Sequence, residues 1–322
     1  MKRNDFWITA KQNWRALAYL LVLTVLAVVL VVICVRRGQD AAQPSPTPRT
    51  SAEVRKDAAQ TLLDGMTTQE KICQLLIVHP EALTGGGTVT GMTDELAAAL
   101  RAYPVGGVLL SAGNMTSGEQ LAALTAALSN GCKTAPLISV DEEGGRVARL
   151  MNTVGTTKLG SMYSYRAQGT QGAHDNAQTI ARDIAAYGFN TDFAPVADVW
   201  TNKRSNAIGD RAYSDDYDEA AELVAAAVKG FHDGGAICCL KHFPGHGSTE
   251  ADSHLGTSVT DRTLDELRET ELLPFREAVR AGVPAVMTTH ILFPQLEPEH
   301  LPATMSRRIM TGLLREQMGF DG

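Results

Sequence analysis

One short segment concentrates the side chains that can move protons or hold polar ligands. Residues 240–256 read LKHFPGHGSTEADSHLG, and the ionisable groups that stand out are Lys241, His242, His246, Asp252 and His254. Proline and glycine at three positions keep most of the segment from forming a helix. Because a charged loop that follows an apolar run is hard to explain by packing, this segment is the candidate active site.

Two kinds of chemistry fit these side chains. Four of them are metal-ligand types, since imidazole and carboxylate groups bind zinc: His242, His246, Asp252 and His254. Alternatively, Asp252 orients His254 as an acid/base pair, while Lys241 and His242 hold the hydroxyl groups of a substrate. The cationic Lys241 would repel a metal ion, which favours the acid/base interpretation. We therefore predict no bound metal and no cofactor.

The elements that must position this loop alternate between apolar runs and helical patterns. A capping box at Thr67 to Glu70 predicts a helix start, and further helices are predicted at residues 117–130 and 175–187. Strands are predicted at residues 75–78, 106–111, 136–141, within 189–199, 236–241 and 285–290. Continuous apolar strands separated by helices indicate a parallel sheet that helices cover.

Several of these strands end in polar residues: Asp141, Asp198, Lys241, His242, Thr288 and His290. In a (β/α)8 barrel the active site lies at the C-terminal ends of the strands, so this placement favours a barrel. A doubly wound sheet would instead need a G-x-G-x-x-G loop after its first strand, whereas TGGG at 84–87 comes late and lacks that form. The predicted fold is α/β, a TIM-type (β/α)8 barrel with about six of its eight strands in this sequence.

An uncharged apolar run precedes this domain. Residues 16–35 contain no charge, proline or glycine, and as a helix they would span about 30 Å, the hydrocarbon thickness of a bilayer. Basic residues are more numerous before this run than after it, which predicts a single-pass membrane protein with residues 1–15 in the cytoplasm. Residues 36–52 are predicted to be a proline-rich linker, and residues 53–322 an extracellular catalytic domain.

Composition and charge exclude other classes of protein. The formal net charge is −7, but the first 37 residues contribute about +5 (six basic, one acidic) and the remainder about −12. An acidic body argues against a nucleic-acid surface, and 44% apolar residues argue against a disordered chain. The five cysteines form no C-x-x-C pair, and we expect them to fill the core rather than build a disulfide framework.

The loop also resembles a known family. KHFPGHGSTEADSH is similar to the K-H-[FI]-P-G-H-G-x4-D-S-H loop of family 3 glycoside hydrolases, in the β-N-acetylhexosaminidase branch. The resemblance covers residues 54–322 and includes LLDGMTTQEKICQLL, VGGVLLSAGN, VDEEGGRVARL, FNTDFAPVADV, GDRAYSDD, VMTTHILFP and LPATMSRRIMTGLLREQMGFDG. The β-glucosidase branch of this family lacks the D-S-H dyad, so the loop also separates the two branches.

The resemblance implies a role for each candidate residue. His254 would be the general acid/base and Asp252 its partner, while Lys241, His242 and Arg211 would hold the hydroxyls of a bound N-acetylglucosamine. Asp141 and Arg146 match the family's DEEGGR segment, and His290 is a further substrate-binding candidate. From the residues alone, a surface ion pair of Arg211 with Asp210, Asp215 or Asp216 is favoured, and His290 could simply bond its neighbours. Many members carry an acidic sugar-binding residue after the first strand, where this sequence has His79.

The implied reaction is retaining glycoside hydrolysis, with histidine in place of the second carboxyl group. An imidazole with an ordinary pKa of about 6.5 can protonate the leaving oxygen and then activate water. In the family the nucleophile is an aspartate on the seventh strand, in a motif resembling G-F-x-G-V-V-x-[ST]-D. This sequence stops at residues 319–322, GFDG, so we expect that aspartate about five residues beyond Gly322.

Two hypotheses follow. In the first, the native protein is a membrane-anchored β-N-acetylhexosaminidase that removes terminal residues from cell-wall muropeptides or other extracellular glycans, and this sequence is a C-terminally incomplete copy. In the second, 322 residues is the whole length, and the protein is a catalytically inactive sugar-binding or degenerate form.

Overall fold

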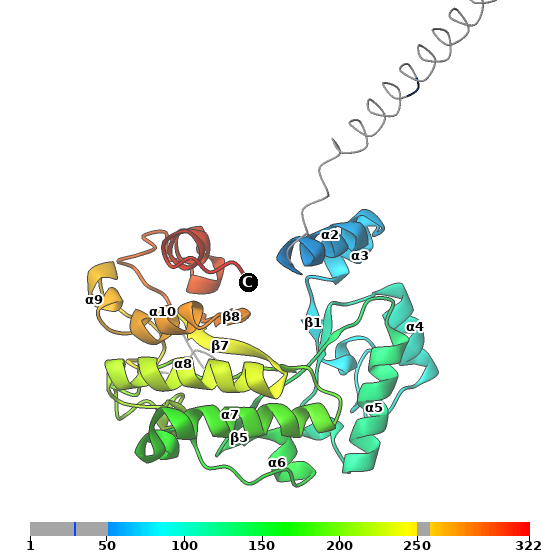
Figure 1. The fold of residues 1–322 in the computed structure, drawn as a ribbon, viewed down its shortest axis with the longest axis horizontal. Helices are drawn as coiled ribbons and strands as arrows, with labels where there is room; N and C mark the ends of the chain where they lie inside the picture. The colour runs from blue at the N-terminus through cyan, green and yellow to red at the C-terminus, as the bar shows by residue number, and fades with distance from the viewer. Residues whose placement is uncertain (1–28, 30–50, 250–257) are drawn as a thin grey trace, which may run out of the picture. The chain divides into compact units, whose positions relative to one another are not determined.

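The computed structural model describes residues 29, 51–249 and 258–322, and the chain divides into two compact units, residues 1–65 and 66–322 (Figure 1). In the first unit it describes Val29, helix α2 (Ser51–Asp64) and Gly65. The predicted membrane segment lies outside the described residues except for Val29. None of the helices that the structure does describe combines the length and apolar character needed to cross a bilayer. The anchor therefore stays a prediction.

The second unit is built on a curled sheet of six parallel strands in the order β1-β2-β3-β6-β7-β8. Their bounds are β1 Ile77–Val78, β2 Gly107–Leu109, β3 Leu137–Val140, β6 Thr191–Asp192, β7 Ile237–Phe243 and β8 Ala285–Thr288. Each predicted strand is present, although most are shorter than their apolar runs. The sheet forms half of a TIM-type barrel, which confirms the predicted fold class at that level.

Helices follow the strands, as predicted for a parallel sheet. Their bounds are α3 Thr68–Cys73, α4 Asp94–Ala102, α5 Gly118–Gly131, α6 Arg149–Thr153, α7 Gly169–Ala186, α8 Tyr217–Gly234, α9 Leu264–Arg268 and α10 Leu272–Arg280. Shorter turns are η1 Pro80–Ala82, η2 Ala112–Asn114, η3 Met162–Gln168, η4 Gly209–Arg211 and η5 Ala303–Met305, and η6 is a π-helix at Arg308–Gln317. Figure 1 shows α7 and α8 side by side, with α10 beyond α8.

Local signals fix several of these helix ends. The predicted capping box is present, with the Thr67 hydroxyl accepting the Glu70 N–H and the Glu70 carboxylate accepting the Thr67 N–H. The side chain of Ser117 caps α5, which confirms the start expected there. Helix α8 begins after Asp216, which caps it, and ends before Gly235 in the left-handed conformation.

Helices α7 and α8 pack closely because two glycines of α8 face α7. A Cβ on Gly230 would lie 2.2 Å from the carbonyl oxygen of His174, and a Cβ on Gly234 would lie 2.4 Å from the Cβ of Ala181. Helix α7 begins at Gly169, earlier than the predicted start near Asp175. Helix α8 of this pair also contacts β7, the strand that leads into the candidate loop.

A small hairpin after β3 was not predicted. Strands β4 (Glu142–Gly144) and β5 (Val147–Ala148) pair antiparallel across a turn of two glycines. Gly144 and Gly145 have φ of +85° and +57°, a region that side chains with a Cβ rarely adopt. The hairpin turns the chain at the C-terminal end of β3 and so brings its carboxylates to the site.

Candidate active site

A cavity of about 710 Å³ lies at the C-terminal ends of β3, β7 and β8. Charged and histidine side chains make up much of its polar lining: Asp141, Glu143, Arg149, Arg211, Lys241, His242 and His290. These are the strand ends at which a TIM-type barrel carries its active site. The structure therefore brings together five of the six residues that the sequence predicted for substrate binding.

Lys241 lies at the centre of a buried network of charges. Its Nζ lies 2.6 Å from Asp141 Oδ1 and 2.6 Å from Glu143 Oε1. Glu143 also accepts two hydrogen bonds from Arg211, from Nε and Nη2, each at 2.8 Å. Two cations and two carboxylates balance one another, so the network carries no net charge. This balance matters because the side chains of Lys241 and Glu143 are only 2% and 1% exposed.

The charges of this network hold each other in the ionised state. Burial by itself would raise the pKa of Glu143, but Lys241 and Arg211 outweigh it and lower the pKa to about 2. Burial would likewise lower the pKa of Lys241, yet Glu143 and Asp141 raise it above its ordinary value. Lys241 is therefore a permanent cation and Glu143 a permanent anion near neutral pH.

Hydrogen-bond capacity remains for a ligand. An ammonium group has three N–H bonds and a guanidinium five. Lys241 directs two of its three to Asp141 and Glu143, and Arg211 directs two to Glu143 and one to the Ala207 carbonyl oxygen. Oδ2 of Asp141 also has no protein partner among the described residues. The cavity can therefore offer both donors and an acceptor to the hydroxyl groups of a sugar.

His242 belongs to a second buried pair. Its Nδ1 lies 2.6 Å from Oδ2 of Asp198, which is completely buried. Burial raises the pKa of Asp198, but the contacts with His242 and His246 together lower it below its ordinary value. Burial, together with the nearby cations Lys241 and Arg211, lowers the pKa of His242 below its ordinary value, although Asp198 acts to raise it. We infer an ionised Asp198 beside a neutral His242 ring.

The loop after β7 is held close to the segment that carries Asp198. The N–H of His246 donates to Asp198 Oδ1 at 2.7 Å, and the Thr249 hydroxyl contacts His246 Nδ1 at 2.8 Å. A Cβ on Gly247 would lie 1.9 Å from the Val199 carbonyl oxygen, so only glycine fits there. The loop continues into residues 250–257, so the predicted Asp252 and His254 lie outside the described residues.

Arg146 lies apart from the cavity lining. Its Nη2 donates to the carbonyl oxygens of Asn206, Ala207 and Ile208, at 2.8, 3.0 and 2.8 Å. These carbonyls directly precede η4, which carries Arg211. Arg146 thus supports the backbone that presents Arg211 to the cavity.

The remaining predicted positions are placed as follows. Arg211 is bound to Glu143 rather than to any of the three aspartates that the sequence offered as surface partners. His290 lines the cavity, and its Nδ1 contacts the Thr304 hydroxyl at 2.9 Å. His79 precedes η1, where the structure gives it no side-chain capping bond.

Sequence reasoning missed Glu143. Asp141 and Glu143 are two positions apart at a strand end, a spacing that points side chains to the same side. Glu142, between them, is anchored at both ends: its N–H donates to Asp192 Oδ1 at 2.9 Å, and its carboxylate accepts the N–H of Leu150 at 2.7 Å. Because side chains alternate in direction along an extended strand, the sequence could have predicted that Glu143 faces the same side as Asp141.

The metal-binding interpretation gains no support from the part of the chain that the structure describes. Within it, no group of three or more histidine, cysteine or acidic side chains is arranged to hold a metal ion. Nδ1 of His242 is occupied by Asp198, and Nδ1 of His246 by Thr249. Asp252 and His254 lie outside that part, so their role is not tested.

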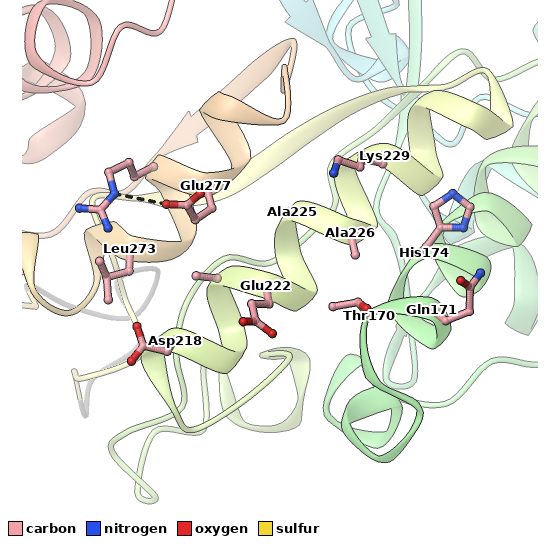
Figure 2. Close-up of a pocket in the computed structure, with 12 residues that line it drawn as sticks. Thr170, Gln171, His174, Asp218, Glu222, Ala225, Ala226, Lys229, Leu273 and Glu277 are labelled. Carbon is pink, nitrogen blue, oxygen red and sulfur yellow. Dashed lines mark hydrogen bonds and ion pairs between the residues drawn. The ribbon is translucent and has the colours of Figure 1, made fainter.

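A second cavity, of about 720 Å³, lies between α7, α8 and α10 (Figure 2). Its charged lining includes His174, Asp218, Glu222, Lys229 and Glu277. His174 is bound to Asp175 and Asp233 at 2.9 and 3.0 Å, and Glu277 pairs with Arg280 at 2.6 Å. These contacts support the helices, whereas the network around Lys241 keeps donors for a ligand.

Comparison with known proteins identifies the family. The profile of the glycosyl hydrolase family 3 N-terminal domain matches residues 67–322, which include the whole strand-end cavity. The chain belongs to glycosyl hydrolase family 3. The resemblance seen in the loop after β7 is thereby confirmed.

Named relatives are similar to this protein over most of the chain. Beta-hexosaminidase A of Pseudoalteromonas piscicida is 36% identical over 253 residues, which cover 73% of this chain and 42% of that protein. A beta-hexosaminidase of Stenotrophomonas maltophilia is 39% identical over 223 residues, 68% of this chain and 65% of that protein. The chain thus spans about two fifths to two thirds of the length of these relatives.

Two solved structures share the fold, and the first is described as a glycoside hydrolase family 3 enzyme. The β-N-acetylglucosaminidase from Paenibacillus sp. FPU-7 has a TM-score of 0.74 and 37% identity, covering 80% of this chain and 48% of that one. NagZ from Neisseria gonorrhoeae, solved in complex with N-trifluoroacetyl-D-glucosamine, has a TM-score of 0.67 and 34% identity, covering 73% and 70%.

Proposed function

We propose that the full-length protein is a retaining β-N-acetylhexosaminidase that removes terminal, non-reducing β-N-acetylhexosamine residues from glycans. The observation that carries this proposal is the neutral charge network around Lys241, which leaves N–H donors and a carboxylate oxygen facing a cavity at the strand ends. A sugar hydroxyl both donates and accepts hydrogen bonds, so it can use both kinds of group. The names of the relatives, which are hexosaminidases, support the choice of sugar.

In this proposal the terminal N-acetylglucosamine lies in the cavity, with hydroxyl groups bound by Lys241, Arg211, His242 and Asp141. His290 lies at the cavity wall on the β8 side and contributes a further polar contact. Arg146 acts on the sugar through the backbone before Arg211. Because the ligand is an uncharged sugar, the balanced network of Lys241, Arg211, Asp141 and Glu143 suits it.

The proton transfers are assigned to the loop after β7. His254 as imidazolium protonates the leaving oxygen, and the neutral ring then activates the water that releases the sugar, with Asp252 orienting the ring. The nucleophilic aspartate is expected on the strand that follows Gly322 in a closed eight-stranded barrel. Both assignments rest on the resemblance of the sequence to its family.

We further propose that residues 16–35 anchor the protein in the cell membrane with residues 1–15 in the cytoplasm. The catalytic domain would then act outside the cell, on cell-wall muropeptides or other extracellular glycans. Protease protection in spheroplasts tests this directly: the body should be cleaved from outside while an N-terminal tag stays protected. Protection of the body would contradict the orientation.

The activity is tested with chromogenic substrates. We expect the full-length protein to release p-nitrophenol from the β-N-acetylglucosaminide and far less from the β-glucoside, and we expect His254→Ala to remove most of this activity. A folded full-length protein that cleaves no β-hexosaminide would contradict the proposal and favour the inactive sugar-binding alternative.

A further inference from the structure

The Asp198 carboxylate restricts the state of the His242 ring. Both of its oxygens are engaged away from solvent: Oδ2 lies 2.6 Å from His242 Nδ1, and Oδ1 accepts the His246 N–H at 2.7 Å. An ionised carboxylate can only accept hydrogen bonds. The proton of a neutral His242 ring must therefore lie on Nδ1, which leaves Nε2 with a free lone pair.

The free nitrogen is placed for a ligand. His242 lines the cavity, and the two ring nitrogens point in diverging directions, so Nε2 points away from the carboxylate that Nδ1 contacts. Among the described residues, Nε2 has no hydrogen-bond partner. The ring of His246 packs edge-on against that of His242, with centroids 5.9 Å apart, which helps to hold its orientation.

The neighbours of His242 in the cavity have the opposite hydrogen-bonding role. Lys241 and Arg211 can only donate hydrogen bonds, whereas a neutral Nε2 can only accept one. A hydroxyl between them could accept from a cation and donate to Nε2 at the same time. An ether oxygen or a fluorine could accept but not donate, so the combination distinguishes a hydroxyl from its blocked analogues.

We propose that Asp198 is a positioning residue that fixes His242 as the Nδ1–H tautomer, so that Nε2 faces the cavity as the hydrogen-bond acceptor for a substrate hydroxyl. The part of this statement that concerns the substrate rests on the proposed function. The same carboxylate also holds the start of the loop that leads to His254, so it joins the ring and the loop in one buried contact.

The tautomer can be measured without any activity. In the full-length protein with 15N-labelled histidine, the two-bond 15N–1H spectrum separates protonated from unprotonated ring nitrogens. His242 can be assigned by loss of its signals in His242→Gln. We expect a protonated Nδ1 and an unprotonated Nε2 in the wild type. A protonated Nε2 in the wild type would by itself overturn the proposal.

Asp198→Asn provides the sharper test. The side-chain amide keeps the size, and its oxygen can still accept the His246 N–H, but its NH2 group now donates to Nδ1. The proton should therefore move to Nε2. Asp192→Asn is the matched control, because Asp192 is also completely buried, at the end of β6 in the same segment, but binds the Glu142 N–H and no histidine. The His242 signals should stay unchanged in this control.

Kinetics then connect the tautomer to the substrate. We expect Asp198→Asn to lower kcat/KM by about 10- to 100-fold. The wild type should prefer the natural substrate to a deoxyfluoro analogue in which fluorine replaces the hydroxyl that Nε2 binds, and Asp198→Asn should lose most of this preference. If the proton of His242 moves to Nε2 in Asp198→Asn but the preference for the natural substrate is unchanged, the role of Asp198 in substrate recognition would be overturned. If the wild type and Asp198→Asn show the expected tautomers but the protein neither binds nor cleaves hexosaminides, the proposed function is refuted. The positioning of His242 by Asp198 would still be established.

Discussion

Lys241 Nζ lies 2.6 Å from Glu143 Oε1, and both side chains are almost completely buried. Glu143 also receives a two-pronged contact from Arg211, so one carboxylate holds two cations that would otherwise repel each other. A buried ion pair is costly to break from one side, because the remaining charge is left without a partner. Glu143 should therefore be the residue on which the charge network most depends.

Replacing Glu143 by glutamine should destabilise the protein strongly. Two buried cations would lose their shared anion, so we expect the free energy of unfolding in urea to fall by about 3–5 kcal/mol. Glu277→Gln is the control, since its pair with Arg280 at 2.6 Å is much more exposed and should contribute about 1 kcal/mol or less. Equal effects of the two substitutions would contradict the role given to Glu143.

The same carboxylate should give a distinct pH dependence. The pKa of Glu143 is lowered from 4.5 to about 2 by Lys241 and Arg211, against the opposing effect of burial. A lowered folded-state pKa stabilises the protein above the unfolded-state value, and this stabilisation is lost as the pH falls towards the folded-state value. The difference in unfolding free energy between wild type and Glu143→Gln should thus narrow as the pH falls below 4.5. If this difference in unfolding free energy widened as the pH fell, the lowered pKa of Glu143 would be contradicted.

Gly247 should not tolerate even alanine. The added Cβ would lie 1.9 Å from the Val199 carbonyl oxygen, so the loop or the segment carrying Asp198 must move. We expect Gly247→Ala to lower the unfolding free energy by about 1–3 kcal/mol and to impair sugar binding. Gly91→Ala, where nothing lies within 4 Å of the added atom, should change stability by about 0.5 kcal/mol or less. A harmless Gly247→Ala would show that the loop is not held as described.

Arg146 and Arg211 should differ in their effect on a bound sugar. Arg211 lines the cavity, whereas Arg146 binds the backbone in front of Arg211 and pairs with Asp210. The inhibition constant of N-acetylglucosamine should rise by about 10- to 100-fold in Arg211→Ala but only a few-fold in Arg146→Ala. The reverse order would mean that Arg146 contacts the sugar directly.

The fold was predictable from the sequence where the signals are local. Apolar runs and capping residues located the six strands and the starts of α3 and α5. The hairpin β4–β5 escaped prediction because its strands are only three and two residues long and the turn glycines give no periodicity. The early start of α7 escaped it because GTQG at 169–172 has poor helix formers, and packing against α8 compensates for them.

The site was predictable residue by residue but not as a set of contacts. A position at the end of a strand is a local feature of the sequence, and it marked Asp141, Lys241 and His242 as candidates. Which carboxylate meets which cation depends on how distant strands are paired, as in the contact of Lys241 with Glu143. For the same reason, the sequence did not show that the Asp198 carboxylate binds His242.

The most direct test of the account is a crystal structure of the protein with N-acetylglucosamine bound. We predict that the sugar lies in the cavity at the ends of β3, β7 and β8, with hydroxyl groups within hydrogen-bonding distance of Lys241, Arg211 and His242. A sugar bound instead in the groove between α7, α8 and α10, with the strand-end cavity unoccupied, would contradict it.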